Sequence, residues 1–341
     1  MKNIWERAVV LPLKFFLQPG TTLVDLGSNI GEVASSIYKG SDGVYLVAVE
    51  ANPDLIPRIR ETLSKNSIVN YEIHNKAAWS DSNSLLTLSI DESPYSTSSS
   101  IYEVNPYSKL IEVSSIAVDD LSHNWPKVSV IKVDVEGAEF EALLGCKVTI
   151  LRDHPVVTYE RTKGNKSVDE FLKSLNYKLY LSNTLDLLTW HNSGDENGIY
   201  NILAIPETIQ LEIRKEFGWY GLISPRLKPG LYVTHVELNP NFTCSNGVGV
   251  WNLKEGYWET AYVTDMRSLS HFTNSTLLFD IESTAEVEIR MTETCKHDHI
   301  VNCFAEKIDL KLNRRNYRIS YPLARRFEFF KAIFRSIRKF N

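Results

Sequence analysis

A turn with two glycines, set between two apolar segments, constrains the fold of this chain more than any other feature. Residues 23–31 read Leu-Val-Asp-Leu-Gly-Ser-Asn-Ile-Gly, and residues 44–49 form a second apolar segment that ends before Glu50. This pattern is typical of a buried parallel strand, a tight turn against a ligand and a following helix. Glu50 lies where a carboxylate accepts hydrogen bonds from both hydroxyls of a ribose. The pattern predicts an adenosine ligand, whereas an ordinary strand-to-helix turn would explain the glycines but not Glu50.

The spacing of the glycines selects among adenosine ligands. A dinucleotide-binding turn reads G-x-G-x-x-G, because the pyrophosphate must lie on bare backbone at a helix N-terminus. Gly27 and Gly31 lack that spacing, and Asp25 would repel a phosphate but can accept a hydrogen bond from an ammonium group. The turn therefore favours S-adenosylmethionine over NAD.

A third segment makes the interpretation more specific. Residues 128–145 read as an apolar strand, an acidic tip at Asp134 and Glu136, and a helix that ends at Gly145. Together with the glycine turn and the Glu-Ala-Asn-Pro corner at residues 50–53, this segment resembles the FkbM-type family of S-adenosylmethionine-dependent methyltransferases. The resemblance covers about residues 20–206. It implies a Rossmann-like methyltransferase fold and O-methylation of a sugar or natural-product hydroxyl.

Apolar segments alternate with helical patterns through this part of the chain. We expect strands at residues 22–26, 45–50, 71–76, 128–134 and 156–160, a helix at 167–175, and a closing strand pair at 177–182 and 200–205. Such alternation predicts an α/β fold with a mostly parallel sheet and helices on both faces. Ligands of these sheets bind beyond the carboxyl ends of the strands, where Asp25, Glu50, Asp134 and Glu160 are expected. Asp119 and Asp120, before the fourth strand, are expected to have a structural role.

The predicted cofactor site combines the glycine turn, the corner after Glu50 and a small-aromatic pair after the third strand. Ala78 and Trp79 can flank an adenine, although Trp79 fits a core position equally well. The expected cofactor-binding residues are Asp25, Gly27, Ser28, Asn29, Gly31, Glu50, Ala51, Asn52, Ala78 and Trp79. The hydroxyl-rich residues 93–101 are expected to form a mobile loop at the acceptor.

The predicted catalytic residues are Asp134, Glu136 and Glu160. Methyl transfer needs an acceptor oxygen in line with the methyl-sulfur bond and a group that removes its proton. Either Asp134 is the general base, or the three carboxylates hold a divalent cation such as Mg²⁺ that lowers the pKa of the hydroxyl. Asp134 can instead cap the following helix, and Glu139 is either functional or solvated. Glu160 resembles the family's carboxylate after the fifth strand, although Arg161 replaces the histidine often found next to it.

The bulk composition limits the classes of function. At 341 residues the chain exceeds the usual size of a single core, so two domains are expected. A net charge of -5 argues against a nucleic-acid substrate. No apolar segment approaches the ~20 residues that span a bilayer, and the N-terminal residues make a poor signal peptide. Four cysteines are too few for a disulfide framework, which favours the cytoplasm.

The pattern changes after Pro206. We expect residues 1–206 to be the methyltransferase domain, 207–230 a linker helix and boundary, and 231–320 a β-sandwich-like accessory domain of short strands. Cys295, His297, His299 and Cys303 would place soft ligands close together, but their spacing fits no standard zinc pattern, and chance clustering or a hairpin disulfide are the alternatives.

Residues 321–341 are predicted to form a basic amphipathic helix. Residues 322–341 contain six basic residues and one acidic residue, a net +5, so the rest of the chain carries -10. The apolar stripe along this helix consists of Leu323, Phe327, Phe330, Phe334 and Ile337. The stripe packs on the protein itself or on a second subunit, or it attaches the protein peripherally to an anionic membrane at the inner face.

The function expected from the sequence is S-adenosylmethionine-dependent O-methylation of a hydroxyl on a sugar, glycan or glycolipid. An NAD-dependent nucleotide-sugar oxidoreductase is the alternative enzyme, disfavoured by the glycine spacing. A non-catalytic glycan-binding protein with a degenerate methyltransferase domain is the alternative of another class. The identity of the acceptor is not encoded in any motif of the sequence.

Overall fold

The computed structural model describes most of the chain from Glu6 to Leu312. The described residues are 6–38, 41–91, 99–102, 108–161, 166–183, 185–188, 200–220, 224, 226–238, 248–253, 257–262, 274–281, 284–291 and 300–312. The predicted C-terminal helix at 321–341 lies outside them, as do Cys295, His297 and His299. Cys303 is described and is buried in a strand.

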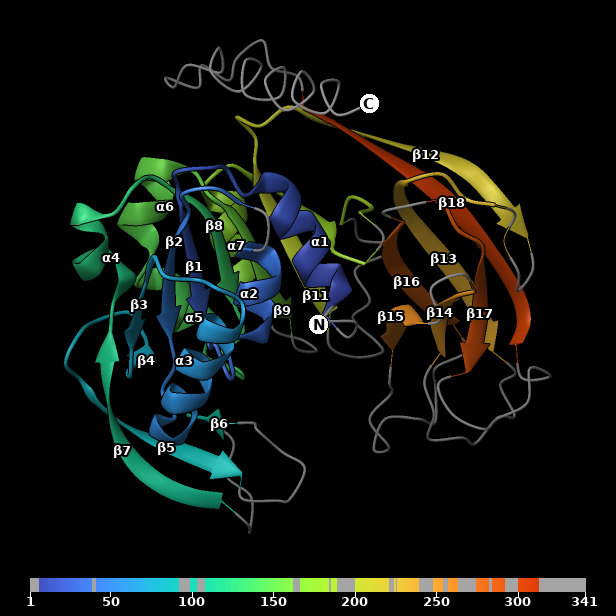
Figure 1. The fold of residues 1–341 in the computed structure, drawn as a ribbon. Helices are drawn as coiled ribbons and strands as arrows, with labels where there is room; N and C mark the ends of the chain where they lie inside the picture. The colour runs from blue at the N-terminus through green and yellow to red at the C-terminus, as the bar shows by residue number, and fades with distance from the viewer. Residues whose placement is uncertain are drawn as a thin grey trace, which may run out of the picture.

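A seven-stranded sheet forms the centre of the first part of the chain (Figure 1). Its order is β10-β11-β9-β8-β1-β2-β3, and all neighbouring strands from β3 to β9 are parallel. The strands are β1 (Thr22–Leu26), β2 (Tyr45–Val49), β3 (Tyr71–His74), β8 (Val128–Val133), β9 (Val156–Arg161), β10 (Tyr177–Leu181) and β11 (Tyr200–Pro206). A dinucleotide-binding sheet has the order 3-2-1-4-5-6, and here the antiparallel β11 is inserted between the fifth and sixth strands.

Helices cover both faces of this sheet, which confirms the predicted α/β architecture. Alternate residues of the strands point to opposite faces, so Leu23 packs in one buried cluster and Val24 in another. The helices of the first face are α1 (Arg7–Phe16), α2 (Glu32–Tyr38) and α3 (Ile56–Lys65), the last preceded by the 3-10 turn η1 (Pro53–Leu55). The second face carries α4 (Val118–Leu121), η2 (Ser122–Asn124), α5 (Glu139–Leu144), α6 (Lys147–Asp153) and α7 (Ser167–Ser174).

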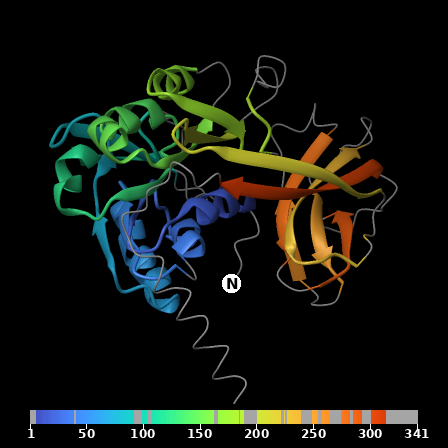
Figure 2. The ribbon, with the colours of Figure 1, turned by 90° about the horizontal axis from the view of Figure 1, so that it is seen from above.

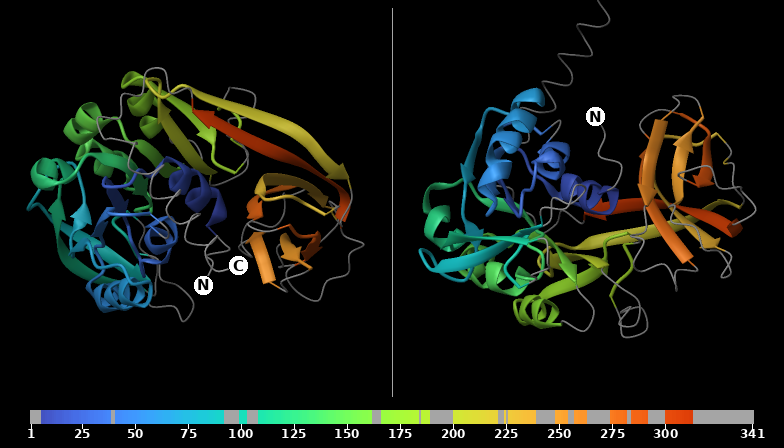
Figure 3. Two further views of the ribbon diagram at one scale, coloured as in Figure 1. Left: turned by 45° about the horizontal axis from the view of Figure 1, so that its top comes forward. Right: turned by 90° about the horizontal axis from the view of Figure 1, so that it is seen from below.

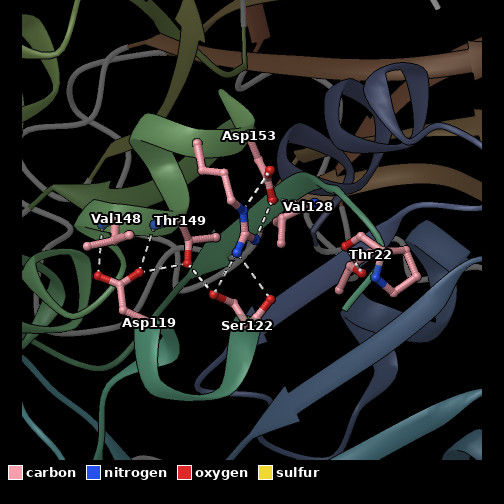
Figure 4. Close-up of polar contacts among 9 residues, drawn as sticks. Thr22, Asp119, Ser122, Val128, Val148, Thr149 and Asp153 are labelled. Carbon is pink, nitrogen blue, oxygen red and sulfur yellow. Dashed lines mark hydrogen bonds and ion pairs between the residues drawn. The ribbon is translucent and has the colours of Figure 1, made fainter. Parts of the chain in front are cut away.

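A polar network fixes the helices that precede and follow β8 (Figure 4). Asp119 accepts hydrogen bonds from the backbone N–H groups of Val148 and Thr149, both at 2.8 Å, at the start of α6. Asp153, at the end of α6, accepts from the N–H of Val128 at 2.9 Å. The network satisfies helix-terminal and strand-terminal amides, so Asp119 has the structural role expected from its position.

A small sheet is inserted between β3 and β8. Its order is β4-β7-β5-β6, formed by β4 (Ala77–Ala78), β5 (Leu85–Asp91), β6 (Ser99–Ser100) and β7 (Ser108–Ile116). It extends from the β3 side of the large sheet (Figure 1). In the segment predicted as a mobile loop, residues 93–98 lie outside the described part of the chain, whereas Ser99 and Ser100 pair with β5.

The later part of the chain is mainly β, as predicted. One sheet has the order β12-β18-β13-β16, and a second has β15-β14-β17. Their strands are β12 (Leu211–Tyr220), β13 (Gly230–Leu238), β14 (Val248–Asn252), β15 (Tyr257–Tyr262), β16 (Asn274–Ile281), β17 (Val287–Met291) and β18 (Ile300–Leu312). Figure 3 shows the two sheets side by side, and one buried cluster joins Val236 and Phe279 with Val250 and Val287. The arrangement is a small β-sandwich.

The linker helix predicted within the boundary segment 207–230 is wrong. Residues 211–220 form β12, which pairs antiparallel with β18 from Leu211 opposite Leu312 to Tyr220 opposite Phe304. Glu, Arg and Lys favour helices only weakly, and pairing with a long neighbouring strand overrides that preference. Residues 211–216 alternate between half-buried and exposed, which is the strand period of two.

The two parts of the molecule share one core through α1. Val9 and Leu13 of α1 belong to the same buried cluster as Leu23 of the parallel sheet and as Val233 and Ile308 of β13 and β18. The buried Arg7 at the start of α1 forms an ion pair with Asp280 of β16. Figure 2 shows β12 and β18, two long strands of the sandwich, reaching toward the parallel sheet. Among the described residues, no helix is long and apolar enough to cross a membrane.

Candidate functional site

A pocket lies beyond the carboxyl ends of β1, β2 and β8. Its walls come from the glycine turn after β1, the corner after β2, the inserted sheet and the loop after β8. The lining residues are Gly27, Asn29, Val49, Glu50, Ala51, Lys76, Ala77, Ala78, Leu88, Ser99, Ile101, Asp134, Val135, Glu136 and Ala138. The structure therefore brings Gly27, Asn29, Glu50, Ala51 and Ala78 of the predicted cofactor residues together with Asp134 and Glu136.

Gly27 is where the turn after β1 touches the loop after β8. Its φ is +73°, and a Cβ atom added to it would lie 1.7 Å from the backbone oxygen of Asp134. No side chain fits in that space, and the positive φ is itself costly for a residue with a side chain. Glycine here allows the two loops that line the pocket to meet.

Glu50 is held in one orientation by backbone amides on both sides. It is 6% exposed, and its Oε2 accepts from Asn29 N and its Oε1 from Asn52 N, both at 2.8 Å. Burial raises the pKa of Glu50, while these two hydrogen bonds and the charge of Lys132 oppose that rise. Each carboxylate oxygen has a further lone pair, so Glu50 can still accept hydrogen bonds from a ligand in the pocket.

Four other predicted cofactor residues lie around the pocket rather than in its lining. Asp25 is 1% exposed, and its Oδ1 lies 3.2 Å from the Nζ of Lys132. Burial raises the pKa of Asp25, and Lys132 opposes the rise. Ser28 donates to the backbone oxygen of Asp25, and Asn52 Oδ1 accepts from Asp54 N at the start of η1. Gly31, with a φ of +79°, approaches Ile59 of α3.

Trp79 packs beside the pocket against another aromatic side chain. Its ring centroid lies 6.1 Å from that of Tyr102, and its backbone N–H donates to the backbone oxygen of Ile116. Ala77 and Ala78 supply the small surface that lines the pocket. The structure thus places Ala78, rather than Trp79, where a flat ring can lie.

The loop after β8 presents Asp134 and Glu136 to the pocket. Glu136 is exposed and has a φ of +51°. Glu139 is 4% exposed, and its Oε1 accepts from Val135 N at 3.3 Å and Gly137 N at 3.1 Å. By accepting these two hydrogen bonds, Glu139 joins the loop after β8 to the start of α5. Ala138 is the N-cap of α5, so the alternative in which Asp134 caps that helix is wrong.

Glu160 lies at the end of β9, outside the pocket lining. Burial, followed by the negative charges of Asp134 and Glu136, raises the pKa of Glu160 to about 8. The negative charges of Asp134 and Glu136 therefore reach Glu160 and favour its protonated form. Within the described residues, however, no group of three or more His, Cys, Asp or Glu side chains is arranged to hold a metal ion. The described residues therefore give no support to the alternative in which Asp134, Glu136 and Glu160 hold a divalent cation.

Sequence reasoning missed two charged residues of this region, Lys132 and Glu6. Lys132 lies in β8 and is 4% exposed. A lysine inside an otherwise apolar strand was the available signal, because buried lysines are rare unless they are paired. Glu6 immediately precedes α1, and burial together with the charge of Asp134 raises its pKa. Nothing in the local sequence indicated that α1 would bring Glu6 to this edge of the sheet.

A family model described as the methyltransferase FkbM domain matches residues 25–179. The matched region contains the glycine turn, Glu50, Asp134 and Glu160, and it confirms an FkbM methyltransferase domain at these residues, as the motifs predicted. No curated protein sequence matches the chain.

Solved structures of other methyltransferases are partly similar to this one. The methyltransferase FkbM from Methylobacillus flagellatus KT has 15% identity and a TM-score of 0.39, covering 58% of this chain and 47% of that chain, so this chain spans about half its length. Precorrin-6y C5,15-methyltransferase from Geobacter metallireducens GS-15 has 15% identity and a TM-score of 0.36, covering 61% and 93%. SMU.1697c, a putative methyltransferase from Streptococcus mutans solved in complex with SAH, has 11% identity and a TM-score of 0.34, covering 57% and 92%.

Proposed function

We propose that this chain, an S-adenosylmethionine-dependent methyltransferase whose residues 25–179 are an FkbM methyltransferase domain, transfers the methyl group to a hydroxyl of a sugar, glycan or glycolipid. The observation that carries the proposal is the meeting of Glu50 and Asp134 in one pocket. Glu50 suits the ribose of the cofactor, and Asp134 suits the proton of an acceptor hydroxyl. The sugar class of the acceptor is supported by the family resemblance.

The charges of the pocket favour a cationic cofactor over a dinucleotide. The charged residues among its lining are Lys76 and the three acidic residues Glu50, Asp134 and Glu136. A sulfonium is attracted to such a surface, whereas a pyrophosphate is repelled. In addition, the N–H of Asn29 in the glycine turn already donates to Glu50. These features disfavour the alternative of an NAD-dependent oxidoreductase.

Different residues of the pocket have different roles in methyl transfer. S-adenosylmethionine, when bound, supplies the activated methyl group. Glu50 and Ala78 are placed to orient its adenosine, and the close contact of Gly27 with the Asp134 loop fixes the distance between the cofactor turn and the base. Asp134 accepts the proton of the acceptor hydroxyl as the new bond forms. Methyl transfer in this scheme does not depend on a metal ion, so activity is expected to survive chelation with EDTA.

Calorimetric titration and methyl transfer test the proposal. S-adenosylmethionine and S-adenosylhomocysteine are expected to bind, and NAD is not. Tritiated methyl groups should then enter extracted cell-surface glycans. Binding of NAD alone would favour the oxidoreductase. Binding of glycans without any transfer to them or to other hydroxyl acceptors would favour the non-catalytic glycan-binding protein.

Asp134→Asn separates cofactor binding from turnover. The amide cannot accept the acceptor proton, and general-base catalysis is worth about 10²–10⁴ in rate. We expect kcat to fall by about that factor while the Kd for S-adenosylmethionine stays within a few-fold. The matched control is Asp120→Asn, an exposed aspartate outside the pocket. Methylation by Asp134→Asn at the wild-type rate would remove Asp134 from the role of base.

A further inference from the structure

Lys132 contacts both the cofactor turn and the proposed base. Its Nζ donates to the backbone oxygen of Gly27 at 2.8 Å, and it lies 3.2 Å from Oδ1 of Asp25 and 3.3 Å from Oδ2 of Asp134. Its side chain is 5% exposed, and that of Asp134 is 37% exposed. Lys132 thus joins the cofactor turn by one hydrogen bond and the two aspartates by two ion pairs.

We propose that Lys132 is a positioning residue for methyl transfer, which fixes Asp134 relative to the cofactor turn. The inference rests on the proposed function, because it acts through Asp134 as base. Lys132 holds Oδ2 of Asp134, so Oδ1 is the oxygen that we assign to the acceptor proton. A base held in one orientation needs no reorganisation when the reaction occurs.

Asp25 has a defined part in this arrangement. It is fully buried in β1, and its charge balances that of Lys132 inside the sheet. Burial opposes the charged form of Lys132, but Asp25 and then Asp134 outweigh that effect and raise the pKa of Lys132 above its usual value. Asp25 thus keeps the ammonium charged in a place where a lone lysine would lose its proton. This accounts for Asp25 facing Lys132 rather than the pocket.

Acidic residues approach the same centre from two further elements. Glu6 at the start of α1 interacts electrostatically with Lys132 and Asp134, and Glu160 of β9 with Asp134. Without the ammonium group, Asp134 would face these carboxyl groups without the charge of Lys132. The ammonium of Lys132 therefore supplies a positive charge beside the Asp134 carboxylate in this acidic surrounding.

The test replaces the buried pair as a unit. Removing Lys132 alone would leave Asp25 as an uncompensated buried charge, which is strongly destabilising, whereas neutral residues of similar shape in both positions are tolerated better. The double variant Asp25→Asn/Lys132→Met is therefore compared with the wild type by thermal unfolding, by calorimetry with S-adenosylmethionine and by steady-state kinetics. The matched control is Asp54→Asn/Lys65→Met, which changes the same residue types at exposed positions.

The expected result is a loss of kcat of at least tenfold, with the Kd for S-adenosylmethionine and the KM for the acceptor within about threefold of the wild type. In an Asp134→Asn background the same double substitution should cause no further loss of kcat, because residues that act as one unit are not additive. An equal loss in both backgrounds, or no loss in either, would overturn the role of Lys132. If Asp134→Asn alone kept full activity, the base assignment in the proposed function would fail instead.

Discussion

Glu50 is the residue whose role is easiest to isolate. Glu50→Ala should weaken the binding of S-adenosylmethionine by about 1.5–3 kcal/mol for a lost charge-assisted hydrogen bond, which is roughly 10- to 100-fold in Kd. Calorimetry measures the change, with Glu61→Ala on the exposed face of α3 as the control. Glu50→Gln keeps one carbonyl oxygen and should give an intermediate Kd. An unchanged Kd in folded Glu50→Ala would remove this residue from the site.

Glu160 makes the stability of the protein depend on pH. Its pKa is about 8 in the folded protein against an ordinary 4.5, so between these values the folded state holds the proton that the unfolded state has released. Stability rises with pH only where the unfolded state binds more protons, so this residue lowers stability as the pH rises from about 4.5 to 8. Below about pH 4.5 Glu160 does not change the free energy of unfolding with pH, and above about pH 8 its full destabilising effect is present.

Glu160→Gln should therefore stabilise the protein more at about pH 8 than at about pH 5. Each pKa unit corresponds to about 1.4 kcal/mol, so the gain between the two pH values should exceed 1 kcal/mol. Urea unfolding at both pH values measures it, and Glu170→Gln, at an exposed position of α7, is the control. An identical change in stability at both pH values would show that Glu160 titrates normally.

The predicted parts of the site depend on residues that are close together in the sequence, whereas the missed parts depend on contacts between distant segments. Gly27 and Glu50 belong to local motifs, because a turn and a strand end are specified by their neighbours. Glu6 and Lys132 reach the site because α1 and β1 pack against β8, and no local sequence pattern encodes that packing. The orientation of Asp25 toward Lys132 is likewise a property of adjacent strands.

The two glycines on either side of β1 form a matched pair, because Gly20 precedes the strand and Gly27 follows it. Gly20 and Gly27 both have a positive φ, of +70° and +73°, but a Cβ at Gly20 meets nothing within 4 Å, whereas one at Gly27 lies 1.7 Å from Asp134 O. Gly20→Ala should cost about 1–2 kcal/mol from backbone strain alone. Gly27→Ala carries the same strain and must also move the Asp134 loop.

We therefore expect Gly27→Ala to abolish turnover and weaken cofactor binding, while Gly20→Ala keeps both near the wild type. Thermal unfolding and calorimetry on the two variants give the comparison. Equal effects of the two substitutions would mean that the loops around the pocket can move apart at little cost.

At the scale of elements, the parallel strands were predictable and β12 was not. The strands of the large sheet are continuous apolar segments, because both of their faces are buried. Residues 211–216 carry several charged side chains that weakly favour a helix, and the sequence prediction followed that preference. Their partner β18 lies about ninety residues further along the chain, and only that pairing decides between helix and strand.

The molecule as a whole depends on the ion pair between α1 and the sandwich. Arg7→Ala should lower the free energy of unfolding by on the order of 3 kcal/mol, because Asp280 would lose its partner at a mostly buried position. Arg7→Met/Asp280→Asn should recover most of that loss. Urea unfolding measures both, with Arg58→Ala on the exposed face of α3 as the control. A wild-type midpoint for Arg7→Ala would show that the shared apolar core alone joins the two parts.

The position of α1 has a consequence for biosynthesis. Val9 and Leu13 of α1 are made more than two hundred residues before Val233 and Ile308, which complete their cluster. At ~5–20 residues per second, the apolar side of α1 waits on the order of ten seconds or more for these partners. During translation this side of the nascent chain is open to chaperones and to aggregation, so conditions that slow elongation should lower the yield of soluble protein.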